Sequence, residues 1–432
     1  MTRKTESESK SSLLIAEIRR FGPFLLSEMK PKGKLATPFN VFAAIVLFVA
    51  VVLLVIRFTQ GLESTTNLSQ DFPWGIWIGF DVITGVAFAG GAYVITFMVY
   101  ILRIEKYHPI VRMTVLNGFL AYVFYAGALL FDLGRPWNVI NPIIGNSFGV
   151  SSVMFLVAWH FMLYMIAEFI EFSPAIAEWL GWKRVRRILG TLTLGTVIFG
   201  ITLSTLHQSG LGALFLMAKS KIHPLWYSEF IPILFFVSSI FAGLSMVIVE
   251  GMISRKVFRS QIDPEHHAAH DDIVVGLARI CAGTMYVYFF LKVLVFIHGQ
   301  HWIHINTPMG WWFLVEIVGF VLIPVRLFAQ AVQFRNLSLI RIAAVLTLIG
   351  IVLNRLNVSI IAFKWYALER YVPSWMELEI TLGVIVAEIL VLGWVVNRMP
   401  ILREHPDWTV PRPELSWKTR LVVKEGAATH ER

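Results

Sequence analysis

The apolar residues of this 432-residue chain fall in long, nearly uninterrupted blocks, and this pattern restricts the fold more than any other feature. A hydrocarbon core of roughly 30 Å is crossed by about 20 residues of α-helix. Ten blocks are suitable, near residues 41–56, 74–102, 113–131, 151–170, 188–206, 231–250, 273–297, 309–328, 340–363 and 375–397. These blocks are too long for the strands of a membrane barrel. The sequence therefore predicts an all-α membrane protein of about ten transmembrane helices.

Polar segments flank the apolar region at both ends. Residues 1–38 are predicted to form a cytoplasmic N-terminal arm with an amphipathic segment, and their polar, basic character argues against a cleavable signal peptide. Residues 39–400 are predicted to form one polytopic transmembrane domain, and residues 401–432 a charged cytoplasmic C-terminal tail. Two short apolar stretches, 137–144 and 211–217, are expected to be half-helices or interfacial helices that cover a cavity.

Basic residues are unevenly distributed along the chain. Most of the 37 Lys and Arg residues lie in the terminal segments and in every second loop, including Lys183, Arg184, Arg186 and Arg187. Loops rich in Lys and Arg stay on the cytoplasmic side of a membrane. We therefore expect a multi-pass protein of the bacterial inner membrane with both termini cytoplasmic. The net charge of +9 then indicates topology and contact with anionic lipid, and no nucleic acid is expected as a partner.

Metal-ligating residues are too few for a resident redox centre. The chain has one cysteine, Cys281, whereas an iron-sulfur cluster needs about four thiolates. A b-type haem needs two facing histidines at one depth, and the candidate pair, His160 and His207, is expected at different depths. The sequence therefore predicts neither haem nor an iron-sulfur cluster in this chain, and any such centre would belong to a partner.

A mixed set of polar side chains is expected in the half of the membrane next to the larger loops. The set comprises Asp81, Tyr122, Tyr125, His207 and Gln208. Ionisable groups within a bilayer are costly unless paired or hydrated, so each is a functional candidate. Carboxylate, phenol, imidazole and amide groups together suit a quinone, because its carbonyl oxygens need hydrogen-bond donors and its quinol form needs proton acceptors. We therefore predict a quinone site at this depth.

A second polar series leads toward the cytoplasmic side. It comprises His160, Tyr164, Glu168, Glu250, Arg279 and Arg326. The first three members are spaced four residues apart, so they share one helical face over about 12 Å. Two interpretations remain open: a proton route, or buried ion pairs that fix helix packing, with Glu250 and Arg326 as the expected pair. The remaining charged residues within the spans, Lys292, Glu316, Arg355 and Glu388, are expected to pair with one another for structural reasons.

Five motifs occur in a fixed order between residues 40 and 400. They are FPWGIWIGFD at 72–81, YHPIVR at 107–112, DLGRPWN at 132–138, LHQS at 206–209 and HPLW at 223–226. Together they resemble the NrfD/PsrC family of membrane subunits, and within it the HybB type of quinone-linked nickel-iron hydrogenases. One departure leaves the partner enzyme open. Hydrogenase-type members tend to have a carboxylate in the outer half of the fourth span, where this chain reads VMFLVAW at 153–159.

The resemblance implies a haem-free integral subunit that binds menaquinone or ubiquinone near the periplasmic face. Its implied partners are a periplasmic iron-sulfur protein and, beyond it, hydrogenase or multihaem cytochrome subunits. Asp81, Tyr122, His207 and Glu250 match positions that look functional in the family.

These observations predict a quinone-reactive membrane subunit of a respiratory oxidoreductase complex, which is not catalytic alone. It would exchange electrons between its iron-sulfur partner and the quinone pool, with proton transfer as an accompanying step. One alternative is a secondary transporter, although the sequence contains no clear internal repeat and no paired interrupted helices. The other is a passive membrane anchor that docks a partner without contacting quinone.

Overall fold

The structure is a computed structural model that describes residues 22–24, 26–30, 35–144, 150–262 and 264–402. In this part of the chain, ten helices are long and apolar enough to cross a membrane. They are Pro38–Gln60, Trp77–Ile101, Glu105–Asp132, Val153–Trp179, Lys183–Ala218, Ile231–Val257, Ala269–His298, Pro308–Gln333, Leu337–Ile361 and Trp375–Val396. The prediction of an all-α chain with ten spans is confirmed. The predicted terminal arm and tail lie largely outside the described residues.

The spans are built from α-helical segments and from shorter segments of 3₁₀ or π geometry, here called η. The first half of the chain contains α2 (Pro38–Gln60), η1 (Leu62–Ser64), η2 (Trp77–Gly85), α3 (Val86–Phe88), α4 (Gly91–Thr96), η3 (Phe97–Ile101), η4 (Glu105–Ile110), α5 (Val111–Ala121), η5 (Tyr122–Ala126), α6 (Leu129–Asp132), η6 (Pro136–Ile140), α7 (Asn141–Ile144), α8 (Val153–Trp179), α9 (Lys183–Ala213) and η7 (Leu214–Ala218). The second half contains α10 (Ile231–Val257), η8 (Arg259–Gln261), α11 (Pro264–His298), η9 (His301–His304), α12 (Pro308–Leu314), η10 (Val315–Leu322), α13 (Ile323–Gln333), α14 (Leu337–Leu356), η11 (Asn357–Ile361) and α15 (Trp375–Val396).

Side-chain caps fix where several spans begin. The Thr37 hydroxyl accepts a hydrogen bond from the backbone N–H of Asn40 at the start of α2, and Asn336 caps α14 in the same way. Ser374 and Glu377 form a reciprocal capping box at the start of α15. Each cap satisfies backbone donors that have no partner in the first turn of a helix. These short polar residues therefore mark the boundaries between loop and span.

Two expected loop elements differ from the sequence prediction. The stretch 211–217 is not a separate half-helix, because α9 and η7 continue the fifth span through it to Ala218. The helix continues through Gly212. A glycine is needed at this position because a side chain would contact the backbone of Ile231 and Pro232. The predicted sixth and seventh spans, 231–250 and 273–297, leave a loop between them, but the chain is already helical from Pro264 onward, where α11 begins. Short helices at 136–144 match the other predicted half-helix.

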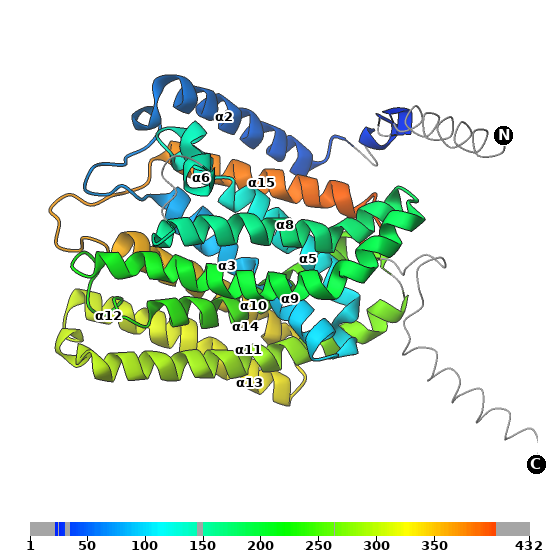
Figure 1. The fold of residues 1–432 in the computed structure, drawn as a ribbon. Helices are drawn as coiled ribbons and strands as arrows, with labels where there is room; N and C mark the ends of the chain where they lie inside the picture. Colours follow the sequence, from blue (N-terminus) through cyan, green and yellow to red (C-terminus); the bar gives the residue numbers. More distant parts are fainter. Residues whose placement is uncertain (1–21, 25, 31–34, 145–149, 263, 403–432) are drawn as a thin grey trace, which may run out of the picture.

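The helix α10 lies at the centre of the helix bundle (Figure 1). It packs against α3, α4 and α9 on one side and against α11 and α14 on the other. The first side continues through α5 and α8, and the second side continues through α13. The first and last spans, α2 and α15, pack against each other at the edge of the first group. The protein is therefore two groups of helices that share α10 as a common wall, and the groups also meet directly where η2 packs against α14 and η11.

Glycines bring α4 and α10 into backbone contact. A side chain at Gly243 would collide with the backbone of Gly90 and Gly91, and one at Gly90 would lie 2.5 Å from the carbonyl oxygen of Ser239. Small residues allow this close approach of helices in a membrane. The crossing also places the hydroxyls of Tyr93 and Ser239 2.9 Å apart. The first helix group is therefore held to the shared helix α10 at this point by backbone packing and by a buried hydrogen bond.

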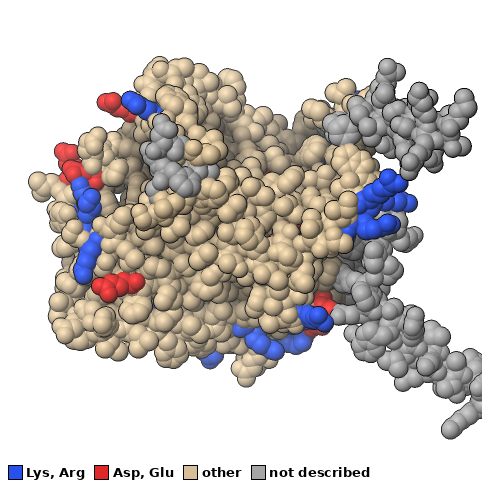
Figure 2. All heavy atoms as spheres, in the orientation of Figure 1, with Lys and Arg blue, Asp and Glu red and all other residues tan. Residues whose placement is uncertain are grey.

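Charged side chains lie toward the two ends of the helices. Figure 2 shows an almost uncharged band between an end that is mainly blue and an end that carries both signs. The mainly basic end contains the connection between α8 and α9, where Lys183, Arg184 and Arg187 are exposed. The start of α2 and the end of α15 lie at this same end (Figure 1). The apolar band matches the hydrocarbon region that ten spanning helices require.

Candidate functional site

Turns with π geometry carry several of the buried polar side chains. Asp81 lies in η2, Tyr122 and Tyr125 lie in η5, and Glu316 lies in η10. A π turn contains an extra residue, which rotates the side chains that follow, and such turns are frequent at functional sites. The structure sorts the polar residues of the first helix group into two separate sets, which we call the Tyr122 cluster and the Glu388 cluster.

The Tyr122 cluster joins η5, α8 and α9. It comprises Tyr122, Tyr164, Glu168, Ser204, His207 and Gln208, and all six residues are buried. The Tyr122 ring lies 4.7 Å from the Tyr164 ring and 5.6 Å from the His207 ring, measured between centroids. Phe161 stacks on Tyr122 at 5.9 Å and lies 6.1 Å from His207. Phenol, imidazole and carboxylate groups therefore meet in one place, inside an aromatic enclosure.

Several polar atoms of this cluster have no hydrogen-bond partner. They are the Tyr122 hydroxyl, Ser204 Oγ, His207 Nδ1 and both carboxylate oxygens of Glu168. Folded proteins satisfy the great majority of their buried polar groups. The Tyr122 hydroxyl faces Ser204 and Gln208, while Gln208 donates from Nε2 to the carbonyl oxygen of Val86 at 2.8 Å. So many unpartnered donors and acceptors at one point fit a place where a polar group binds.

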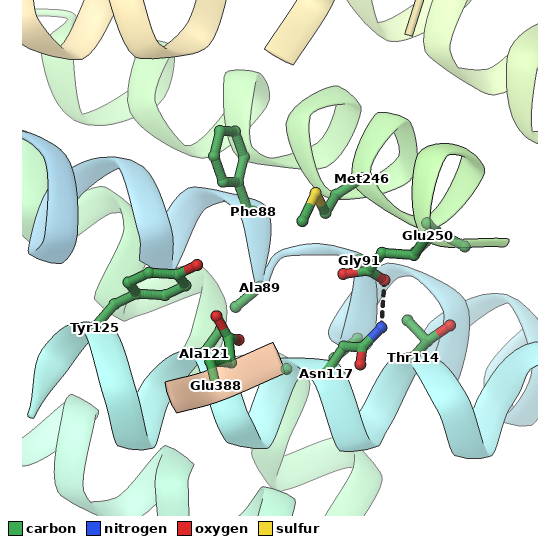
Figure 3. A pocket seen from close by; sticks show the side chains of 13 residues that line it. Phe88, Ala89, Gly91, Thr114, Asn117, Ala121, Tyr125, Met246, Glu250 and Glu388 are labelled. Atoms are coloured by element: carbon green, nitrogen blue, oxygen red, sulfur yellow. Dashed lines mark hydrogen bonds between the residues drawn. The ribbon is translucent and has the colours of Figure 1, made fainter. Parts of the chain in front are cut away.

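The Glu388 cluster lies between α4, α5, α10 and α15 and surrounds a small cavity (Figure 3). Tyr125, Glu388, Asn117 and Glu250 line this cavity of about 20 Å³, and Asn117 Nδ2 donates a hydrogen bond to Glu250 Oε2. A space of this size holds about one water molecule. The cluster is therefore large enough for a proton relay through water and too small for a quinone ring.

Asp81 joins the Glu388 cluster from the loop side. It is fully buried, and Asp81 Oδ2 accepts a hydrogen bond from Thr381 at 3.0 Å while Oδ1 has no partner. Thr381 and Glu388 are seven residues apart on α15 and therefore share one face of this helix. Tyr125 interacts electrostatically with Glu388, Asp81 and Glu250. Asp81 and Tyr125 thus lie with Glu250 rather than with His207.

The predicted series of residues is only partly continuous in space. Tyr164 and Glu168 lie in the Tyr122 cluster, and His160 lies near His207 at its partly exposed edge. Arg279 and Arg326 are exposed on the outer surface and do not extend either cluster. Since Glu250 bonds to Asn117 and Arg326 points outward, the expected ion pair between Glu250 and Arg326 does not form.

Sequence reasoning missed the positions of Glu388, Ser204 and Asn117. Glu388 was noticed as a charged residue within a span and assigned to structural pairing. Its seven-residue spacing from Thr381 was the available signal for a polar face on α15. No sequence signal distinguishes Ser204 from the other serines and threonines of α9.

A group of histidine and tryptophan side chains surrounds His223 in the loops at the end of the molecule that carries the larger loops. His223 is buried, and its ring lies 4.7 Å from that of Trp365 and 5.4 Å from that of His304. His223 Nδ1 accepts a hydrogen bond from the backbone N–H of Leu225. Burial, with the neighbouring His304 and His301, lowers the pKa of His223 to about 4. The folded protein therefore holds this imidazole neutral.

This environment predicts a loss of stability in acid. An unfolded histidine binds a proton below about pH 6.5, whereas folded His223 does so only near pH 4. The contribution of His223 is therefore complete above pH 6.5 and declines as the pH falls toward 4. In His223→Asn, the amide oxygen keeps an acceptor for Leu225, and the fall in melting temperature between pH 7 and pH 4.5 should be smaller than in the wild type. The exposed His298→Asn is the control, and equal falls in all three proteins would contradict the expectation.

The ten spans and the buried polar clusters define a multi-pass integral membrane protein with polar groups enclosed between its helices. A family model described as "Polysulphide reductase, NrfD" matches residues 64–364. The chain belongs to this NrfD family, which confirms the resemblance found from its motifs.

Three relatives cover most of the chain. A protein of Nitratidesulfovibrio vulgaris is 43% identical over 376 residues, which cover 87% of this chain and 97% of that protein. The "Probable Ni/Fe-hydrogenase 2 b-type cytochrome subunit" of Escherichia coli is 30% identical over 86% of this chain and 94% of its own length. The "Menaquinone reductase, integral membrane subunit" of Nitratidesulfovibrio vulgaris is 26% identical over 81% of this chain and 87% of its own length.

The name of the Escherichia coli relative raises the question of haem, and the residues here do not fit one. The His207 ring packs against Tyr122 at 5.6 Å and against Phe161 at 6.1 Å, so a porphyrin at His207 would displace both rings. Among the described residues, no group of three or more His, Cys, Asp and Glu side chains could hold a metal ion.

Proposed function

We propose that this chain is the quinone-reactive membrane subunit of a respiratory oxidoreductase complex. The Tyr122 cluster carries the proposal, because it combines phenol, imidazole and carboxylate groups that are buried and lack hydrogen-bond partners. The names of two relatives support it, since one is named as a hydrogenase subunit and the other as a menaquinone reductase subunit. The carrier would be menaquinone or ubiquinone.

In this proposal, the Tyr122 cluster binds and orients the quinone head group. The quinone supplies the chemistry of two electrons and two protons, and the electrons are exchanged with clusters of the partner. The Tyr122 hydroxyl donates a hydrogen bond to one carbonyl oxygen, and His207 accepts or returns a proton at Nδ1. Glu168 next to Tyr164 receives that proton. His160, at the partly exposed edge of the cluster, marks the side from which a lipid-soluble molecule enters.

The Glu388 cluster supports a second part of the proposal, a proton route past the quinone site. Asp81, Tyr125, Glu388 and Glu250 follow one another along η2, η5, α15 and α10, and the water-sized cavity lies between the last three. Intramembrane carboxylates that face a hydrated space are typical of proton relays. We therefore assign Asp81 and Tyr125 to the proton route and not to the quinone head group. Arg279 and Arg326 have no part in the proposed proton route.

The distribution of basic residues supports an orientation in the bacterial inner membrane. The end that contains Lys183, Arg184 and Arg187 is cytoplasmic in this proposal, which places both termini there. The opposite end, which contains the group of histidine and tryptophan side chains around His223, then faces the periplasm. Its partner is a periplasmic iron-sulfur protein that leads to a hydrogenase or to multihaem cytochrome subunits.

Two variants test the proposed quinone site. In Tyr122→Phe and His207→Asn, we expect quinol turnover by the affinity-purified complex to fall by about 10²-fold, because each removes a group that exchanges a proton or hydrogen bond with the head group. The fluorescence quenching of a hydroxyquinoline N-oxide, a quinol analogue, by the isolated full chain should be lost as well. Tyr286→Phe, on the exposed surface of α11, is the control for both measurements.

Co-purification of the partner subunits, measured together with quinol turnover, distinguishes a quinone-reactive subunit from a passive membrane anchor. Normal co-purification of partners with lost turnover in the two variants supports a quinone-reactive subunit. Normal turnover in both variants, in an equally complete complex, would show that quinone is handled by another subunit.

A further inference from the structure

The second helix group contains a buried charged network that the proposed quinone site does not use. Its carboxylate is Glu316, which is 1% exposed. Glu316 accepts hydrogen bonds from Trp226 Nε1 at 2.7 Å, from Asn354 Nδ2 at 2.7 Å and from Asn357 Nδ2. All three donors are neutral, and among the described residues no cationic side chain bonds directly to this carboxylate.

Two cationic side chains are buried beside Glu316. Arg355 is 1% exposed, donates to Ser238 Oγ at 2.7 Å and to Asn354 Oδ1 at 2.9 Å, and lies 3.7 Å over the ring of Phe235. Lys292 is also buried, and its ammonium lies 5.8 Å from the Tyr288 ring and 5.9 Å from the Phe313 ring. Among the described residues, Lys292 has no hydrogen bond or ion pair. The expected structural ion pairs of Lys292 and Arg355 with Glu316 are therefore replaced by longer-range attraction.

The charges of this network do not balance. One carboxylate faces two cationic groups, and an excess charge in a membrane interior is strongly unfavourable. An arginine guanidinium stays protonated in proteins, whereas a lysine amine is able to release its proton. Lys292 is therefore the group at which the excess charge is removed or restored.

A path of imidazoles leads from Lys292 to the loops. His301 in η9 is 7% exposed, interacts electrostatically with Lys292 and His304, and has no hydrogen-bond partner at Nδ1. His304 is partly exposed and faces His223. The groups that face Lys292 are thus Tyr288 on its own helix, Phe313 on α12, Glu316 on η10, Arg355 on α14 and His301 on η9.

The wall helix α10 links this network to the Tyr122 cluster. Ser238 accepts from Arg355 on one side, and the next residue, Ser239, bonds to Tyr93 on the other. Tyr93 in turn interacts electrostatically with Tyr122. Two adjacent serines of α10 thus contact Arg355 on one side and, through Tyr93, the surroundings of Tyr122 on the other.

We propose that Lys292 is a proton-binding site of the second helix group, which exchanges protons with the loop side through His301 and changes its charge when the quinone site turns over. This inference rests on the proposed quinone function for its coupling, and on the buried charge imbalance for the site. The second helix group then transfers one proton in addition to the two protons of the quinone reaction.

The site is tested on the isolated full chain, without quinone. The melting temperatures of wild type and Lys292→Met are compared between pH 6 and pH 9. If Lys292 binds and releases a proton in the folded chain, the difference between the two proteins changes slope within this range. The exposed Lys219→Met is the control and should follow the wild type. A difference that stays constant, or changes at one rate throughout, overturns the site.

The coupling is tested on the affinity-purified complex in liposomes, driven by a soluble naphthoquinol with an artificial electron acceptor for the redox centres of the partner. We expect the wild type to move more protons per two electrons than the quinone reaction accounts for, and Lys292→Met to lose this extra proton with quinol turnover retained. An unchanged proton ratio in Lys292→Met, or no extra proton in the wild type, overturns the coupling. Absence of turnover in the wild type overturns the quinone function and the coupling together, and the melting curves still decide the site.

Discussion

Replacement of Gly243 by alanine or valine is expected to prevent α4 of the first helix group from packing against the shared helix α10. The new β-carbon would fall on the backbone of Gly90 and Gly91 in α4, which no change of rotamer relieves. Overpacking of a well-packed interior costs about 1–3 kcal/mol when side chains give way, and the cost is higher where only backbone is available. We expect most of the Gly243→Val protein to be absent from the monodisperse peak in detergent size-exclusion chromatography.

A matched control separates this effect from a general cost of changing glycine in a membrane helix. Gly283 in α11 has no atom within 4 Å of the position that a β-carbon would occupy. Gly283→Ala should therefore be folded as well as the wild type. A folded Gly243→Val protein with a normal melting temperature would mean that α4 and α10 do not cross as described.

The second large effect is expected at Glu377, which ties the loop before the second span to the start of α15. Its buried carboxylate accepts hydrogen bonds from the Tyr371 hydroxyl at 2.5 Å and from the backbone N–H groups of Ser374 and Asn67 at 2.8 and 3.2 Å. In Glu377→Ala these donors lose their acceptor, and a buried unsatisfied group costs about 1–3 kcal/mol. We expect a stability loss of about 3 kcal/mol or more.

Melting temperatures in detergent provide the measurement for this prediction. Glu377→Gln retains one acceptor oxygen and should lie between wild type and Glu377→Ala. The exposed Glu369→Ala, in the same loop region, should match the wild type. If Glu377→Ala melts with the wild type, the capping box does not hold these loops together.

The number and class of helices could be predicted from the sequence because the membrane requires long apolar blocks. The ends of the helices could not be predicted, because hydropathy does not indicate how far a helix continues outside the membrane. The fifth span shows this most clearly, because it begins at Lys183 and ends at Ala218. The sequence predicts a separate short helix at 211–217, whereas Gly212 within this stretch lies in a continuous helix and packs closely against the start of α10.

The residue types of the candidate site could also be predicted, but their grouping could not. Tyr122 and Tyr125 are three residues apart, which in a regular helix places them on one face. In the structure they lie in a π turn, with Tyr122 beside His207 and Tyr125 beside Glu388. A single sequence carries no visible signal for such a turn. Arg279 and Arg326 failed for a different reason, because their long side chains reach the surface from positions within the spans.

The shared wall helix also limits how this architecture can change over evolution. Because Ser238 serves one helix group and Ser239 the other, inserting or deleting one residue before them in α10 would turn each toward the wrong neighbours. Neither group can therefore be exchanged for a homologous one as an independent module. Length variation among relatives should accumulate in the connections between spans, while α10 keeps its register.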